Sequence, residues 1–213
     1  MRIRASRVEQ VGRNRAAVLE AARRVFLERG YAGATLEGIA DEAGFSKGVV
    51  YSQFASKADL FLALLHQRIE ERAAENERIA ADAVGTGGVM ALLRNFELDA
   101  RVEADWARVL IEFRALALRD PALNRRYTEA HARTVDLLAA VLQGLHARAG
   151  VEPAFGPRTM AELILAVGAG VTLERAADPD ALPWPALTRM VTGALGLSPA
   201  GDREAVRAAE VTS

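Results

Sequence analysis

Residues 35–54, TLEGIADEAGFSKGVVYSQF, decide how the N-terminal part of this chain folds. Thr35 can cap a short helix, because its hydroxyl accepts a hydrogen bond from a free N–H group at the helix start. Gly44 can end that helix in a tight turn, since glycine adopts positive φ values without strain. Ala40 is small enough to let a second short helix, opening at Ser46, cross the first closely. The stretch therefore predicts a helix-turn-helix, whose second helix places its N-terminal residues against base edges in the major groove of DNA.

The sequence around this stretch carries a helical pattern almost without interruption. Apolar residues recur at helical spacing, and alternating β-branched segments of the kind that mark strands are absent. We therefore expect an all-α protein whose helices are separated by glycine and proline. Besides the two short helices of residues 35–54, the expected helices cover residues 13–30, 57–84, 88–101, 104–119, 122–149, 158–177 and 184–196.

The composition excludes several classes of protein. The chain has 213 residues, more than a lone DNA-reading module of about 60 residues needs, and 51% of them are hydrophobic. It contains no cysteine, which excludes disulfides, thiolate metal sites and cysteine nucleophiles. The N-terminus lacks the apolar core of a secretory signal, and the longest charge-free apolar stretch, residues 163–173, is far shorter than the about 20 residues of a membrane span. We expect a cytoplasmic protein with no membrane contact.

Charge is distributed unevenly along the chain. The net charge is −1, but residues 1–60 hold ten Lys or Arg against seven Asp or Glu, which leaves residues 61–213 with an acidic excess. Five arginines fall within the first fifteen residues. Such a segment is typical of a basic arm that follows a phosphate backbone, and equally of a solvated terminus.

Residues 22–65, ARRVFLERGYAGATLEGIADEAGFSKGVVYSQFASKADLFLALL, resemble the N-terminal domain of the TetR family of repressors. The family pattern has counterparts here in Gly30, Ile39-Ala40, the run Ala43-Gly44-Phe45-Ser46-Lys47-Gly48, Tyr51, Phe54 and Lys57. The resemblance implies an N-terminal three-helix DNA-binding domain followed by a helical domain that binds a ligand and dimerises. We place the boundary near residue 57, with an N-terminal arm and DNA-binding domain in residues 1–56 and an effector-binding and dimerisation domain in residues 57–213.

The resemblance also implies roles for individual residues. Phosphate contacts are expected from Thr35, Ser46, Tyr51 and Lys57, and base contacts from Lys47, Val49 and Gln53, while Gly48 and Ser52 lie on the same surface of the motif. Hydroxyl and ammonium groups suit phosphate oxygens, lysine can reach guanine, glutamine can pair with adenine, and valine can meet a thymine methyl. The alternatives are a solvated side chain for Lys47 and core packing for Tyr51 and Phe54.

Three other functions are compatible with parts of the sequence. Residues 44–48 match the G-x-S-x-G elbow of hydrolases around Ser46, but the elbow needs a preceding strand and the sequence has no strand signal. A di-metal site in a helix bundle needs Glu-x-x-His pairs, which none of His66, His131 and His146 completes. A helical adaptor without DNA binding is the third rival, and the density of helix-turn-helix features disfavours it. We expect no catalytic residue, no metal and no cofactor.

Dimerisation is expected because one recognition helix contacts too few base pairs for specific affinity. Residues 158–177 are apolar nearly all round, and together with residues 184–196 they resemble the family's four-helix dimer interface. The candidate interface residues are Leu163, Val167, Gly168, Gly170, Val171, Leu187, Met190 and Val191. A buried helix within one subunit is the alternative.

An effector pocket is implied by the resemblance rather than by a ligand signature. The remaining helices carry apolar and aromatic residues that can line a cavity, although most such residues belong to cores. The candidates are Phe96, Trp106, Leu110, Phe113, Leu116, Tyr127 and His131. We hypothesise a mainly apolar or aromatic small molecule, with Glu112, Arg114 or His131 available to orient it.

Overall fold

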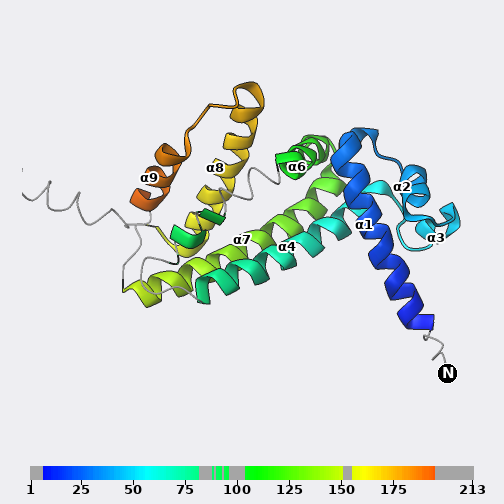
Figure 1. Ribbon diagram of the computed structural model, residues 1–213, viewed down its shortest axis with the longest axis horizontal. Helices are drawn as coiled ribbons and strands as arrows, with labels where there is room; N and C mark the ends of the chain where they lie inside the picture. The colour runs from blue at the N-terminus through cyan, green and yellow to red at the C-terminus, as the bar shows by residue number, and fades with distance from the viewer. Residues whose placement is uncertain are drawn as a thin grey trace, which may run out of the picture. The chain divides into compact units, whose positions relative to one another are not determined.

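The structure, a computed structural model, describes residues 7–81, 88, 90–92, 94–95, 104–150 and 155–194. The regular elements among these residues are all α-helices, which confirms the all-α prediction (Figure 1). They are α1 (Arg7–Gly33), α2 (Leu36–Ala43), α3 (Lys47–Tyr51), α4 (Lys57–Ala81), α6 (Ala104–Ala117), α7 (Pro121–Ala149), α8 (Pro157–Ala177) and α9 (Trp184–Ala194). Most of the helix expected over residues 88–101, including the pocket candidate Phe96, lies outside the described residues.

The first helix differs from its predicted bounds at both ends. It begins at Arg7 rather than at residue 13, and its polar first turns are joined by side-chain hydrogen bonds from Gln10 to Asn14 and from Arg13 to Gln10. Its end lies at Gly33 rather than at residue 30, and Gly30 interrupts the helix with a non-helical conformation of positive φ, at φ 69° and ψ 174°. This combination of angles is essentially restricted to glycine.

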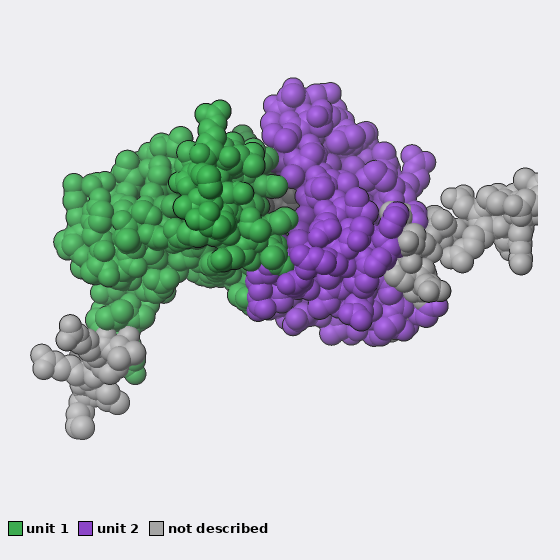
Figure 2. All heavy atoms as spheres, turned by 180° about the vertical axis from the view of Figure 1, so that it is seen from behind, with its two compact units in different colours: residues 1–72, 103–132 green, residues 73–102, 133–213 purple. Residues whose placement is uncertain are grey.

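The chain divides into two compact units, coloured separately in Figure 2. The first comprises residues 1–72 and 103–132, and the second comprises residues 73–102 and 133–213. Both α4 and α7 begin in the first unit and end in the second. The predicted boundary near residue 57 remains a prediction about function, whereas the packing places α6 and the start of α7 with the N-terminal helices.

Aromatic rings form the core of the first unit. Phe61 of α4 is fully buried at its centre. Its ring centroid lies 4.5 Å from that of Phe113, 5.2 Å from those of Phe26 and Tyr31, and 5.4 Å from that of Trp106. Edge-to-face and offset arrangements at such distances add to the free energy that burial of the rings supplies. Helices α1, α4 and α6 are thereby held together around one side chain.

The second unit has an aliphatic core. Ala80 near the end of α4 packs with buried residues of α7 and α8, among them Leu142, Leu145 and Met160. Arg148 of α7 donates a hydrogen bond to the Ala80 carbonyl at 3.0 Å, which satisfies a free acceptor at the end of α4.

Among the described helices of both units, none combines the length and the apolar character needed to cross a lipid bilayer.

Replacing Phe61 with alanine should lower the free energy of unfolding by about 3–5 kcal/mol, because a buried ring is lost and a cavity remains. Urea denaturation followed by circular dichroism measures the change. The matched control is Leu118→Ala, since Leu118 is 78% exposed. Equal stability of the two variants would contradict the central place of the Phe61 ring.

Candidate nucleic-acid interface

The pair α2 and α3 has the geometry that the sequence predicts. The Thr35 hydroxyl accepts a hydrogen bond from the Gly38 N–H at 3.0 Å and so caps α2. Gly44 ends the helix in the left-handed conformation, with φ 70° and ψ 25°. The Phe45 N–H donates to the Ala40 carbonyl at 3.0 Å and closes the turn before α3. On the inner side of the pair, Ile39 and Val50 are fully buried.

The outer side of the pair exposes most of the residues predicted to contact DNA. Lys47 opens α3 with a side chain that is 63% exposed, and the ring of Tyr51 at the end of that helix is 48% exposed. Thr35, Ser46, Gly48 and Ser52 are also exposed, and Val49 is half-buried. Ser52 donates its hydroxyl to the Val49 carbonyl at 2.8 Å. The structure thus brings these residues to one short stretch of the surface, while their individual contacts with DNA remain predictions.

Gln53 is placed differently from the other predicted base contacts. It follows the end of α3, and its N–H donates to the Val50 carbonyl. The side chain is half-buried, and its Oε1 is shielded from solvent without a hydrogen-bond partner among the described residues. A contact between a base and this oxygen therefore requires the amide to turn outward.

Lys57, for which a phosphate contact is predicted, binds carbonyl groups at the end of α1. Its Nζ donates to the carbonyl oxygens of Tyr31 at 2.7 Å, Ala34 at 2.9 Å and Ala32 at 3.2 Å. The ammonium also lies 4.6 Å from the centroid of the Tyr31 ring, a favourable position for a cation. Burial lowers the pKa of Lys57, and the nearby Glu112 carboxylate opposes that shift. An ammonium has three donors, and all three are engaged here.

Glu112 of α6 binds the same turn from its N–H side. One carboxylate oxygen accepts hydrogen bonds from the N–H groups of Tyr31 at 2.8 Å and Ala32 at 3.2 Å. The approach needs the absence of a side chain at residue 30, since a Cβ on Gly30 would lie 2.8 Å from Glu112 Oε1. From the sequence, Glu112 was expected only to orient a ligand. The paired interaction of Lys57 and Glu112 with one turn was missed, because no local pattern links residues so far apart in the chain.

A second acidic residue lies among the predicted DNA contacts. Glu37 of α2 accepts a hydrogen bond from the Tyr51 hydroxyl at 2.9 Å, and its Oε1 lies 3.9 Å from Lys47 Nζ. Its own backbone N–H, followed by the Tyr51 hydroxyl, lowers the pKa of Glu37. The carboxylate is therefore ionised while it contacts the side chains of Tyr51 and Lys47, both of which are predicted to contact DNA.

The predicted pocket residues differ in how deeply they are buried. Trp106, Phe113 and Tyr127 are buried, and the first two belong to the aromatic core around Phe61. His131 stacks on the Tyr127 ring at 5.8 Å. The other two candidates differ from these, since Leu110 is half-buried and Leu116 is 46% exposed. The effector pocket and the residues proposed for it remain a prediction.

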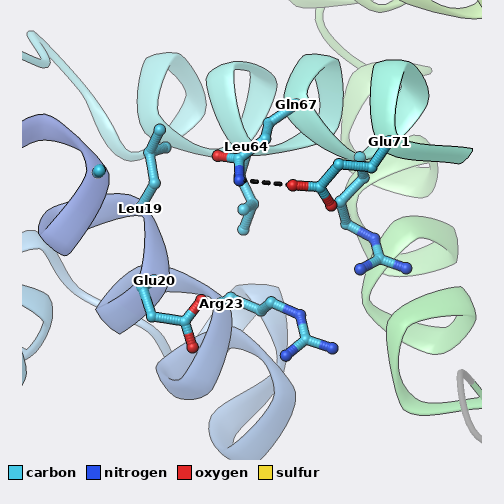
Figure 3. Close-up of a pocket in the computed structure, with 8 residues that line it drawn as sticks. Leu19, Glu20, Arg23, Leu64, Gln67 and Glu71 are labelled. Atoms are coloured by element: carbon cyan, nitrogen blue, oxygen red, sulfur yellow. Dashed lines mark hydrogen bonds between the residues drawn. The ribbon is translucent and has the colours of Figure 1, made fainter. Parts of the chain in front are cut away.

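A hollow of about 220 Å³ does lie between α1 and α4 of the first unit (Figure 3). Its lining is mostly polar and carries both charge signs, and none of the predicted pocket residues belongs to it. On the α4 side of the hollow, Gln67 donates a hydrogen bond to Glu71, one turn further along the helix, at 2.7 Å. The lining residues are Ala16, Leu19, Glu20, Arg23, Leu64, Gln67, Arg68 and Glu71.

The candidate dimer residues of α8 and α9 are partly accessible. Leu163 is 43% exposed and Met190 is 49% exposed, a high value for large apolar side chains on helices. Val167, Gly168, Gly170 and Val191 are half-buried, whereas Val171 and Leu187 are buried within the subunit.

Among the described residues, no cluster of three or more His, Asp or Glu side chains could hold a metal ion.

A capped α2, a glycine turn and an α3 with exposed polar residues define a helix-turn-helix protein. Comparison with known proteins identifies the family. Residues 18–64 match the family described as bacterial regulatory proteins, tetR family, and residues 89–196 match the one described as BetI-type transcriptional repressor, C-terminal. The chain belongs to the TetR family of transcriptional regulators, as its motifs predicted.

Similar proteins agree with this assignment. The HTH-type transcriptional repressor AcnR of Corynebacterium diphtheriae is 32% identical over 140 residues, 66% of this chain and 67% of that protein. The HTH-type transcriptional activator FasR of Mycolicibacterium smegmatis is 46% identical over 56 residues, 26% of each chain. A structure of Salmonella enterica GusR has 25% identity and a TM-score of 0.67, and the match covers 86% of this chain and 95% of that one.

The chain spans between 57% and 67% of the length of the AcnR repressors that it matches. The family and these relatives are regulators of transcription and not enzymes, so the hydrolase and metalloenzyme alternatives have no counterpart among them.

Lys57→Met should lower the free energy of unfolding of the DNA-free protein by about 1–3 kcal/mol, because the carbonyl oxygens at the end of α1 lose their donor. Urea denaturation provides the measurement. The control is Lys47→Met, which removes an exposed ammonium and should change stability by less than about 0.5 kcal/mol. If both variants were equally stable, Lys57 would be free to contact phosphate instead.

Proposed function

We propose that this protein is a homodimeric repressor that binds double-stranded operator DNA through the α2–α3 surface and is controlled by a small-molecule effector. The observation that carries the proposal is the exposed start of α3, where Lys47 is the first residue of the second helix of the helix-turn-helix. In such frames the first residues of the second helix enter the major groove. Since operator DNA lies in the bacterial cytoplasm, the proposal places the protein there.

Individual residues are given roles that their surroundings allow. Lys47 reads a guanine edge and Val49 meets a thymine methyl. Thr35 contacts a phosphate, because its oxygen caps α2 while its hydroxyl proton stays available for donation. Phosphate near this point is also favoured by the positive end of the α2 dipole. Ser46 and Tyr51 supply further hydroxyl donors.

Lys57 is assigned a different role from the one that the resemblance implies. A phosphate contact would require its ammonium to leave three carbonyl oxygens. We assign it instead to the positioning of the α1–α2 turn. A base contact by Gln53 is retained as part of the proposal, with the outward rotation of its amide that this contact needs.

Dimerisation is proposed through α8 and α9. Support comes from the exposed apolar side chains of Leu163 and Met190, which a second copy would cover. Two copies also double the number of base pairs read, which specific affinity at a genomic site requires. The half-buried Gly168 and Gly170 would allow the α8 helices of two subunits to approach closely.

The effector is proposed to be a small apolar or aromatic molecule that releases the protein from DNA. The support is the match of residues 89–196 to the C-terminal part of a repressor family, together with the aromatic content of α6 and α7. An effector that separated the packed rings would have to offset the burial free energy of each displaced ring, about 1.5–3 kcal/mol. Operator DNA and effector would weaken each other's binding by the same factor.

Selection from a pool of randomised duplexes tests the DNA-binding part of the proposal. The full-length protein should enrich an inverted repeat whose half-sites are about 34–36 Å apart, as two symmetric subunits require. Lys47→Ala should still bind DNA but lose discrimination at one base pair of each half-site, worth about 1–3 kcal/mol. Sequencing of the bound fraction measures both effects.

The control for this selection is Arg125→Ala, which removes an exposed cation from α7 and should leave the enriched sequence unchanged. A pool that stays random after repeated rounds would overturn sequence-specific binding. Enrichment of single, unpaired half-sites would overturn the dimer while leaving DNA binding intact.

A further inference from the structure

Glu37 places a negative charge on the surface proposed to bind DNA, where negative charge weakens binding. It is the second residue of α2 and its side chain is 42% exposed. Its closest charged and polar neighbours are two predicted DNA contacts, Lys47 and Tyr51. A carboxylate here repels phosphate and holds groups that phosphate would otherwise attract.

Both contacts of Glu37 connect α2 to α3. The Tyr51 hydroxyl donates to Glu37 Oε1 at 2.9 Å, and the same oxygen lies 3.9 Å from Lys47 Nζ. One carboxylate oxygen therefore engages residues at the beginning and at the end of α3. DNA can use these groups only after it offers acceptors that replace this oxygen.

We propose that Glu37 is a specificity-determining residue that weakens binding to DNA of arbitrary sequence more than binding to the operator. The inference rests on the DNA-binding function proposed above. Non-specific binding comes almost entirely from neutralised phosphates, so a carboxylate that partly cancels Lys47 acts on it directly. At the operator Lys47 gains a base edge, and this contact offsets the loss of Glu37. Discrimination through an unfavourable interaction with the wrong partner is a general route to specificity.

The same helix provides a matched control residue. Glu42 also has a side chain that is 42% exposed, but its carboxylate pairs with Arg24 of α1 at 2.7 Å. Glu42→Gln removes the same charge from α2 without releasing Tyr51 or Lys47. A difference between the two glutamine variants therefore reports the local contacts of Glu37 rather than the net charge of the helix.

The experiment measures the affinity of full-length wild type, Glu37→Gln and Glu42→Gln for two duplexes over a series of salt concentrations. One duplex carries the site enriched by the wild type, and the other is poly(dI-dC). Glu37→Gln should bind poly(dI-dC) about fivefold more tightly per subunit at low salt, and its salt slope should steepen by about 0.9 for the phosphate that Lys47 gains. Its affinity for the selected site should change by less than about twofold, so the specificity ratio falls.

Other outcomes overturn the inference. If Glu37→Gln weakened binding to both duplexes equally, Glu37 would only position α3. If Glu42→Gln changed the specificity ratio as much as Glu37→Gln, the net charge of α2 would be responsible. If Glu37→Gln folds poorly, Glu37→Ala takes its place in the experiment. It removes the acceptor as well as the charge, and the same changes in affinity are expected of it. A wild-type protein that enriched no site would refute the proposed function itself, a result separate from these.

Discussion

The rest of the first unit depends on the hydrogen-bond partners of the backbone N–H and C=O groups between α1 and α2. A helix end leaves N–H and C=O groups without partners, and here Gly30 breaks α1 just before α2 begins. Lys57 donates to three of the carbonyl oxygens, and Glu112 accepts from two of the N–H groups. Lys57 of α4 and Glu112 of α6 thus hold residues 31–34, the last residues of α1 and the one that follows, from both sides. Because α2 follows directly, its place is determined by residues far away in the chain.

This arrangement connects the core with the DNA-reading surface. Tyr31, the first residue after the break, packs its ring on Phe61 and Phe113 while its backbone binds Lys57 and Glu112. From there the Thr35 cap, the Gly44 turn and the buried Ile39 and Val50 set the direction of α3. Glu112 lies within the residues that match the C-terminal repressor family. That part of the sequence therefore contributes a direct support to the helix-turn-helix, and any displacement of α6 acts on the same turn.

Local patterns predicted most of the helices, because glycine, proline and capping residues act on their immediate neighbours. The positions of Gly44 and Thr35 were sufficient to locate α2, and the resemblance to the TetR family identified the surface of α3. The same reasoning underestimated the length of α1, since its first turns are polar and carry no apolar stripe. It proposed Phe113 and Trp106 as pocket residues but could not show that their rings contact Phe61, because spacing does not tell which rings are neighbours. Lys57 and Glu112 meet at a turn more than twenty residues from either, and only the folded chain brings them together.

Amide hydrogen exchange at Tyr31 and Ala32 tests most directly whether the α1–α2 turn is held by these side chains. In Glu112→Ala both amides should exchange at least about tenfold faster than in the wild type, and protection across α2 should fall with them. Amides in the core of the second unit should keep their protection, which separates the effect from general unfolding. Unchanged protection at Tyr31 and Ala32 would contradict the account, because the turn would then be held by something other than Glu112.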